Sequence, residues 1–163
     1  MKNGIITISR EYGSGGREIA KRAAEKLGIP FYDKELIYKA AEESGFTPEF
    51  VAEKEQRLGS SFFFNFSVGG IYGMAYPREP EMKELPVAEQ IYLAQKKVIE
   101  DLAAKGPCIF VGRCADYILK ERTDLLKVFI YADRRARECR AVEQYGRVEE
   151  NVSQVVRQID KQR

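Results

Sequence analysis

A short apolar run that leads into a glycine-rich turn constrains the fold of this chain more than any other feature. Residues 5–9 carry three isoleucines, as a buried parallel strand would. A glycine loop follows at 13–16, and apolar residues then recur at helical spacing up to Leu27, with Gly28 where a helix would stop. Glycines let backbone N–H groups turn inward, beside the positive end of the helix dipole. The order strand, glycine loop, helix therefore predicts a phosphate-binding loop.

The loop departs from the usual phosphate-binding string G-x-x-x-x-G-K-[ST]. Aligned with that string, Arg10 takes the first glycine and Gly15 the second. Gly16 then stands in place of the lysine, and Arg17 in place of the hydroxyl residue. Arg17 keeps a positive charge one place later, and a guanidinium can hold two phosphate oxygens at once. Two alternatives stay open: a glycine turn that serves only packing, and an Arg17 that pairs with an acid such as Glu18, Asp33 or Asp133.

The composition is that of an ordinary soluble globular protein, and 163 residues are enough for one domain with its own core. A net charge of +2 gives no support for binding to a nucleic acid polymer. Since the chain has no histidine, Ser-His-Asp triads, Cys-His pairs and histidine-containing zinc sites are excluded. Three cysteines without a C-x-x-C pair indicate reduced thiols in a cytoplasmic protein. No stretch is long enough for a signal peptide or a membrane span.

Hydrophobic spacing predicts alternating strands and helices along the rest of the chain. The expected elements are a strand at 30–32, helices beginning at Asp33 and at Thr47, a helix at 87–105, a strand at 108–111, a helix at 116–122, a strand at 126–131 and a last amphipathic helix with Val152, Val155, Val156 and Ile159. The strands are continuously apolar and lie between amphipathic helices. This pattern predicts an α/β fold with a parallel sheet.

Residues 59–86 are irregular and rich in phenylalanine, glycine and proline. A loop of this length inside a compact domain is usually a lid or a binding flap. Its clustered aromatic rings would stack on a base or close over a substrate in that case. An oligomer contact or a small core under the loop is equally compatible with the pattern.

Polar side chains follow several predicted strands at the end where α/β sheets bind ligands. Arg113 and Asp116 follow the strand at 108–111, which indicates a site for a polar ligand. Asp33 follows the preceding strand, either as a helix cap or as a ligand-binding group. Arginines crowd the segment 134–147. That segment is either a solvated helix face or, if it lies opposite the glycine loop, a phosphate clamp.

Three strings in the chain resemble the cytidylate kinase-like family, which belongs with the P-loop nucleoside monophosphate kinases. The strings are I-S-R-E-Y-G-S-G-G-R-E-I-A, F-Y-D-K-E-L-I and I-F-V-G-R-C-A-D-Y-I-L, and the resemblance covers nearly the whole chain. It implies a single three-layer P-loop domain over 1–163, with a nucleotide-binding flap at about 46–86 and an arginine-bearing lid at about 134–163. It also implies phosphoryl transfer from ATP, with Mg²⁺, to CMP or a similar monophosphate. Relatives continue with a last strand and helix, which we do not expect in this chain.

The resemblance, together with the strand-end position of Asp33, assigns roles to individual residues. The expected groups are Gly13, Ser14, Gly15, Gly16 and Arg17 for ATP; Arg17, Arg137 and Arg140 for the transferring group; Asp33, Gln95, Arg113 and Asp116 for the acceptor; and Arg157, Asp160 and Arg163 for the far side of the lid. Asp133 or Asp33 would hold a magnesium-bound water.

Replacement of the loop lysine leaves two alternatives to a nucleoside monophosphate kinase. One is a regulatory module that binds a nucleotide without turning it over. The other is a kinase of a different small phosphate-accepting or hydroxyl substrate. In each case the expected partners are small molecules, mainly nucleotides, rather than nucleic acid polymers or membranes. The sequence leaves the oligomeric state open.

Overall fold

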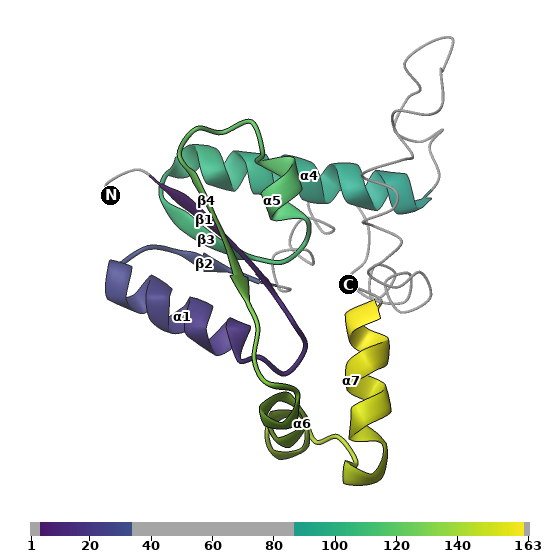
Figure 1. The fold of residues 1–163 in the computed structure, drawn as a ribbon. Coiled ribbons are helices and arrows are strands. Elements are labelled where there is room, and N and C mark those ends of the chain that lie inside the picture. The colour runs from purple at the N-terminus through teal and green to yellow at the C-terminus, as the bar shows by residue number, and fades with distance from the viewer. Residues whose placement is uncertain (1–3, 34–86, 162–163) are drawn as a thin grey trace.

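The computed structural model describes residues 4–33 and 87–161 of the chain. Within these ranges four strands form one sheet: β1 (Ile5–Arg10), β2 (Phe31–Tyr32), β3 (Cys108–Val111) and β4 (Leu125–Ile130) (Figure 1). Their order is β2-β3-β1-β4, and every pairing is parallel. The expected parallel α/β sheet is therefore confirmed, with β1 between two neighbours.

Helices cover both faces of this sheet, which makes three layers (Figure 1). α1 (Gly16–Leu27) covers one face, and α4 (Val87–Lys105) with the short α5 (Ala115–Ile118) covers the other. The buried cluster on the α1 face consists of Ile8, Ala20, Ala24, Ile109 and Val111. The cluster on the α4 face consists of Ile5, Ile99, Ala103, Cys108, Phe110, Ala115 and Leu119. Because successive side chains of a strand point to opposite faces, a strand covered on both sides is apolar throughout.

α1 packs on the sheet through its small residues. Gly16, Ala20 and Ala24 are buried, whereas Ile19 and Leu27 of the same apolar pattern are 48% and 57% exposed. Small residues at the contact let the helix axis approach the strands closely. The first turn of α1 consequently lies beside the carboxyl end of β1.

The helix expected at 116–122 is shorter than predicted and begins one residue earlier, at Ala115. Residues 119–121 form a turn instead, in which the N–H groups of Lys120 and Arg122 donate to carbonyls three residues back, at 3.2 and 3.0 Å. Arg122 then pairs with Asp124 at 2.8 Å, directly before β4. These tight bonds end the helix and return the chain to the sheet within a few residues.

α6 (Arg134–Glu143) and α7 (Val152–Lys161) pack together beyond the carboxyl ends of the strands (Figure 1). A 3₁₀ turn at Glu149–Asn151 precedes α7. The two helices bury Ala141, Val152 and Val156 between them, and Tyr12 packs against this cluster. The amphipathic helix expected near the end of the chain is therefore confirmed. Its contact with Tyr12 joins the helix pair to the segment that follows β1.

Some sequence-based expectations fall outside the described residues. They are the flap at 46–86, the helices expected to begin at Asp33 and Thr47, and Arg163. In residues 4–33 and 87–161, no helix combines the length and the apolar character that a membrane crossing requires.

We predict that Ile109→Ala lowers the free energy of unfolding by about 3 kcal/mol, since Ile109 is completely buried at the centre of the sheet. Phe129→Ala is the control: its ring is 61% exposed on the outer strand β4, so we expect a loss below about 1 kcal/mol. Urea unfolding followed by circular dichroism measures both. Equal losses in the two variants would contradict the assignment of Ile109 to the core.

Candidate functional site

The glycine loop leaves β1 and turns back on itself before α1 begins. Both the N–H and the hydroxyl of Ser14 donate to the carbonyl of Glu11, at 3.3 and 2.9 Å. Gly13 and Gly15 have φ angles of 78° and 80°, in the left-handed region that glycine adopts without strain. Gly15 is the N-cap of α1 and supplies no side-chain cap. The first N–H groups of α1 therefore emerge at a loop built without bulky side chains, an arrangement suited to an anion.

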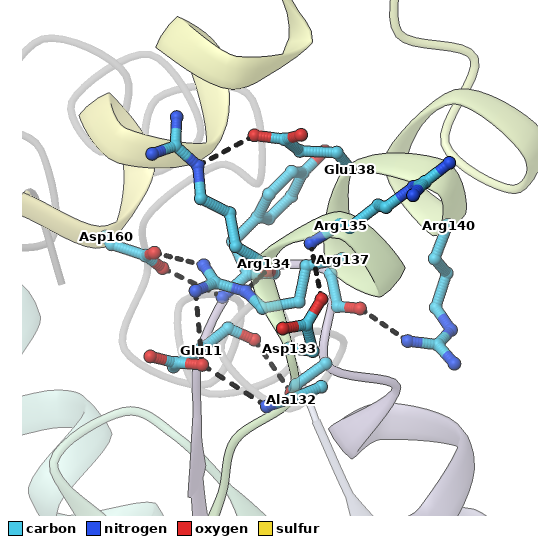
Figure 2. A network of polar contacts seen from close by, with 12 residues as sticks. Glu11, Ala132, Asp133, Arg134, Arg135, Arg137, Glu138, Arg140 and Asp160 are labelled. Carbon is cyan, nitrogen blue, oxygen red and sulfur yellow. Dashed lines mark hydrogen bonds and ion pairs between the residues drawn. The ribbon is translucent and has the colours of Figure 1, made fainter.

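Arg137 and Asp160 hold this loop in place from the side of α6 and α7 (Figure 2). Arg137 is 6% exposed; its Nε donates to the carbonyl of Tyr12 at 2.8 Å, and its Nη1 lies 3.1 Å from a carboxylate oxygen of Glu11. Its Nη2 pairs with Asp160, whose other oxygen accepts the N–H of Tyr12 at 2.9 Å. The guanidinium of Arg137 thus connects the loop to α7. The expected role of Arg137 at the transferring group stays a prediction, since these contacts all hold the loop in place.

Arg140 is the α6 arginine that lies directly against the glycine loop. Its Nη1 donates to the carbonyl of Gly13 at 2.6 Å. A methyl group on Gly15 would lie 3.4 Å from the Cζ atom of Arg140. Arg140 therefore lies beside both left-handed glycines, so the expected proximity of the α6 arginines to the loop is present.

Two arginines lie close to Asp33 at the carboxyl ends of the strands. The Asp33 side chain is only 7% exposed, and the Nε atom of Arg17 lies 2.6 Å from one of its oxygens. Arg10 Nη2 lies 3.9 Å from the other oxygen. Pairing of Arg17 with Asp33 is one of the alternatives that the sequence left open. The Arg17 side chain is 54% exposed, so this pairing and a contact with phosphate are compatible.

Arg10 is not among the site residues that the sequence predicted. The one available signal was its alignment with the first glycine of the phosphate-binding string. The string has glycine at that position, whereas this chain has arginine, a long and positively charged side chain.

A strained turn follows β3. Gly112, Arg113 and Cys114 have consecutive φ angles of 72°, 62° and 53°. A left-handed conformation costs a non-glycine residue about 1–2 kcal/mol, and such strain tends to persist where it serves a site. The N–H of Gly112 donates to the carbonyl of Ile8 at 3.0 Å, which fixes the turn to β1. Arg113 therefore leaves the sheet at a defined place beside the strand that carries the glycine loop.

The other expected acceptor residues lie on the α4 side of the sheet. Asp116 is in the first turn of α5, directly after the strained turn. Gln95 of α4 is 6% exposed, and its Nε2 atom has no hydrogen-bond partner in the part of the chain that the structure describes. A buried amide without a partner is unfavourable, so Gln95 is compatible with a bound polar ligand. Contact of these residues with an acceptor stays a prediction.

The remaining expected residues divide between structural and exposed positions. Asp133 is the N-cap of α6, where its carboxylate accepts the N–H of Arg135 at 2.9 Å. Arg157 is exposed on α7. Across residues 4–33 and 87–161, no three His, Cys, Asp or Glu side chains gather as metal ligands. A magnesium-bound water on Asp133 or Asp33 stays a prediction.

Two further ionisable groups show how the surroundings set charge. Burial raises the pKa of the Cys108 thiol to about 11, so this thiol stays protonated at neutral pH and is no nucleophile. The hydrogen bond from Arg134 lowers the pKa of Glu138 and keeps this carboxylate charged. Arg134 also donates a hydrogen bond to Ser153 of α7. Some α6 arginines therefore contact the glycine loop and others contact α7.

A model of the cytidylate kinase-like family matches residues 5–163, almost the whole chain. The chain belongs to the cytidylate kinase-like family. The match confirms the resemblance seen in the sequence strings. It makes a kinase-like function the general expectation, while the acceptor is not specified. Comparison with curated proteins gave no significant match.

Solved structures with a similar fold include an uncharacterized protein from Eubacterium ventriosum, at 27% identity and a TM-score of 0.63, covering 97% of this chain and 71% of that one. A gluconokinase from Sinorhizobium meliloti has 14% identity and a TM-score of 0.53, with coverage of 96% and 74%. A shikimate kinase from Bacteroides thetaiotaomicron has 17% identity and a TM-score of 0.51, with coverage of 96% and 76%. The two kinases are too distant to indicate more than the shared fold.

We predict that Gly13→Ala destabilises the protein more than Gly28→Ala does. Both residues are left-handed, so each substitution costs about 1 kcal/mol or more from the backbone alone. A methyl at Gly28 meets open space, whereas one at Gly13 would lie 2.6 Å from the carbonyl oxygen of Arg137. We therefore expect Gly13→Ala to lower the free energy of unfolding by about 2 kcal/mol more than the control.

Thermal and urea unfolding measure this difference. Equal losses in the two variants would mean that α6 does not lie against the glycine loop in solution.

Proposed function

We propose that the protein transfers the γ-phosphoryl group of ATP to the phosphate of a nucleoside monophosphate, CMP or one of similar size. In this reaction the bond between the γ-phosphorus and its bridging oxygen breaks, and a bond forms to an oxygen of the acceptor phosphate. The products are ADP and a nucleoside diphosphate. Little covalent chemistry is required of the protein, which has to align the groups and stabilise their negative charge.

The observation that carries the proposal is the meeting of cations from separate elements at the glycine loop. Arg140 comes from α6 and lies against Gly13 and Gly15, while Arg17 comes from the first turn of α1. The backbone N–H groups at the start of α1 would bind the donor phosphates. Arg140 would then stabilise the charge on the transferring group, and Arg17 would bind an outer phosphate oxygen.

On the acceptor side the proposal uses the strained turn after β3. Arg113 would bind the acceptor phosphate from its fixed place beside β1. Asp116 and Gln95 would contact the base or a neighbouring arginine. Asp33 orients Arg17 and Arg10 through its buried carboxylate. CMP is the favoured acceptor because the string G-R-C-A-D resembles the part of the family motif that meets CMP.

ATP and Mg²⁺ fit the described residues to different degrees. The glycine loop accommodates phosphates, because its left-handed glycines and the uncapped start of α1 expose N–H groups. The described carboxylates form no dedicated cluster for a cation. Magnesium would therefore be held mainly by the nucleotide phosphates and water, as is common for this ion, with Asp133 or Asp33 holding at most one of its waters. Bound Mg²⁺ would supply charge neutralisation at the phosphates.

A second function is favoured by one observation. Gly16 occupies the position of the phosphate-binding lysine, so a module that binds a nucleotide without transferring phosphate is the alternative. Isothermal titration with ATP-Mg²⁺ and a coupled assay against a panel of monophosphates and small hydroxyl substrates separate the two. ATP binding together with the formation of ADP and a nucleoside diphosphate supports the kinase. ATP binding without turnover of any acceptor supports the module.

We predict that Arg140→Ala lowers the rate of phosphoryl transfer about 100-fold, the usual scale for loss of one positioned charged donor. Arg22→Ala is the matched control, because Arg22 is an exposed arginine of α1. The control is expected to keep the wild-type rate. Steady-state kinetics with ATP and the best acceptor give the comparison, and an unchanged rate in Arg140→Ala would remove Arg140 from the mechanism.

For Arg17 we predict a weaker and graded effect. Arg17→Ala should lower ATP affinity or turnover by roughly 2 kcal/mol, on the scale of a charged hydrogen bond. Arg17→Lys should recover only part of the loss, since an ammonium cannot hold two oxygens in the same way. Isothermal titration and kinetics measure both. If a folded Arg17→Ala variant matches the wild type, pairing with Asp33 is the whole role of Arg17.

A further inference from the structure

Arg10 and Gly16 occupy complementary places in the phosphate-binding string. The usual string has glycine first and lysine seventh. The positive charge therefore comes from the start of the helix, and the strand ends in a residue without a side chain. In this chain the first place is Arg10, at the end of β1, and the seventh is Gly16, at the start of α1. The cationic residue and the glycine have therefore exchanged places relative to the usual string.

The two residues exclude each other sterically. A Cβ atom on Gly16 would lie 2.7 Å from Cβ and 2.9 Å from Cγ of Arg10, closer than real Cβ contacts. These Arg10 atoms are next to the backbone of β1, where Arg10 is in register with Ile130 of β4. They cannot move aside as the far end of a flexible side chain can. With Arg10 present, the position that normally bears the lysine accommodates only glycine.

The Arg10 side chain runs from the glycine loop to the acceptor side of the site. Its Nη1 atom occupies the place of a Cβ on Gly112, in the strained turn that presents Arg113. Its Nη2 atom lies 3.9 Å from Asp33. The guanidinium therefore lies across the carboxyl ends of β1, β3 and β2, between the expected positions of donor and acceptor phosphates.

The charge balance also favours an anion beside Arg10. Asp33 already has Arg17 at 2.6 Å, so two guanidinium groups share one carboxylate, and the three groups together carry one positive charge. At 3.9 Å, the contact between Arg10 Nη2 and Asp33 is an ion pair beyond hydrogen-bond distance. The Arg10 side chain is 22% exposed, which weakens solvent screening and strengthens its effect on a nearby phosphate.

We propose that Arg10 is a further catalytic residue, which contacts the transferring phosphoryl group in place of the missing lysine. This inference rests on the proposed function, and it adds that the cation reaches the phosphates from the strand rather than from the helix. Arg10 stabilises negative charge on the phosphoryl oxygens while the bond to ADP breaks and the bond to the acceptor forms. Its own proton stays in place throughout, because the guanidinium is always charged at neutral pH.

The test compares five variants with the wild-type protein, using ATP-Mg²⁺ and the best acceptor from the panel. Arg10→Met removes the charge and keeps an apolar stem. We expect about a 100-fold fall in kcat with a smaller change in KM for ATP, since the contact strengthens as charge develops. Arg122→Met is the control, because Arg122 pairs with Asp124 before β4 begins, at the opposite ends of the strands, and should keep wild-type kinetics.

The remaining three variants, Gly16→Lys, Arg10→Gly and Arg10→Gly/Gly16→Lys, test the exchange itself. Gly16→Lys should lower the unfolding temperature, because its Cβ collides with Arg10. Arg10→Gly/Gly16→Lys restores the first glycine and the lysine of the usual string and leaves Arg17 at the hydroxyl position, so it should regain the lost stability and exceed the turnover of Arg10→Gly by at least about 10-fold. This comparison remains decisive if Arg10→Met fails to fold.

The possible outcomes separate the two proposals. Wild-type turnover in a folded Arg10→Met variant, or an exchanged variant no faster than Arg10→Gly, overturns the role of Arg10 and leaves the kinase function standing. If the wild-type protein binds ATP and transfers nothing, the kinase function fails. In that case a 10-fold or larger loss of ATP affinity in Arg10→Met keeps Arg10 as a phosphate ligand. Unchanged ATP affinity in Arg10→Met rules out that role for Arg10. If the wild-type protein does not bind ATP, both proposals fail.

Discussion

The central position of β1 determines where the charged groups of the site can lie. Because β1 pairs in parallel with β3 and β4, the ends of three strands meet at one edge of the sheet. Arg10 ends β1, the strained turn with Arg113 ends β3, and Asp133 follows β4 and caps α6. Groups far apart in the sequence therefore become neighbours through the backbone pairing of the sheet. Ligand binding at this edge is the general rule for open α/β sheets.

Much of the fold follows from local patterns in the sequence. The strand Ile5–Arg10 begins with an isoleucine-rich run and Cys108–Val111 is apolar throughout, as expected for strands covered by helices on both faces, and α4 has the bounds that its spacing predicts. The helix α5 was expected but its early end was not, because that end depends on hydrogen bonds three residues back and on the pair Arg122–Asp124. Propensity and periodicity contain no information on such a turn.

The candidate site was only partly predictable, for a related reason. The glycine loop and an α6 arginine beside it were expected, because residue type and order indicate phosphate chemistry, and Arg140 does lie against that loop. Which arginine serves which purpose depends on distances that no pattern gives: Arg137 is buried against Tyr12 and Asp160, and Arg140 lies against the loop. Arg10 was missed because the string assigns no function to a side chain at the first position. Its importance appears only when the space around Gly16 and Gly112 is considered.

The hydrogen bond between Tyr12 and Asp160 spans 148 positions of the chain. During synthesis on the ribosome, β1 and the glycine sequence emerge first, and Asp160 emerges long afterwards. Until then the loop lacks the contacts through which Arg137 and Asp160 set its shape. In a nascent chain that already contains β1, α1 and most of the sheet, the loop therefore still lacks these contacts. Under the proposed function, nucleotide would stabilise the fold only late in folding, when nearly all of these 163 residues have left the ribosome.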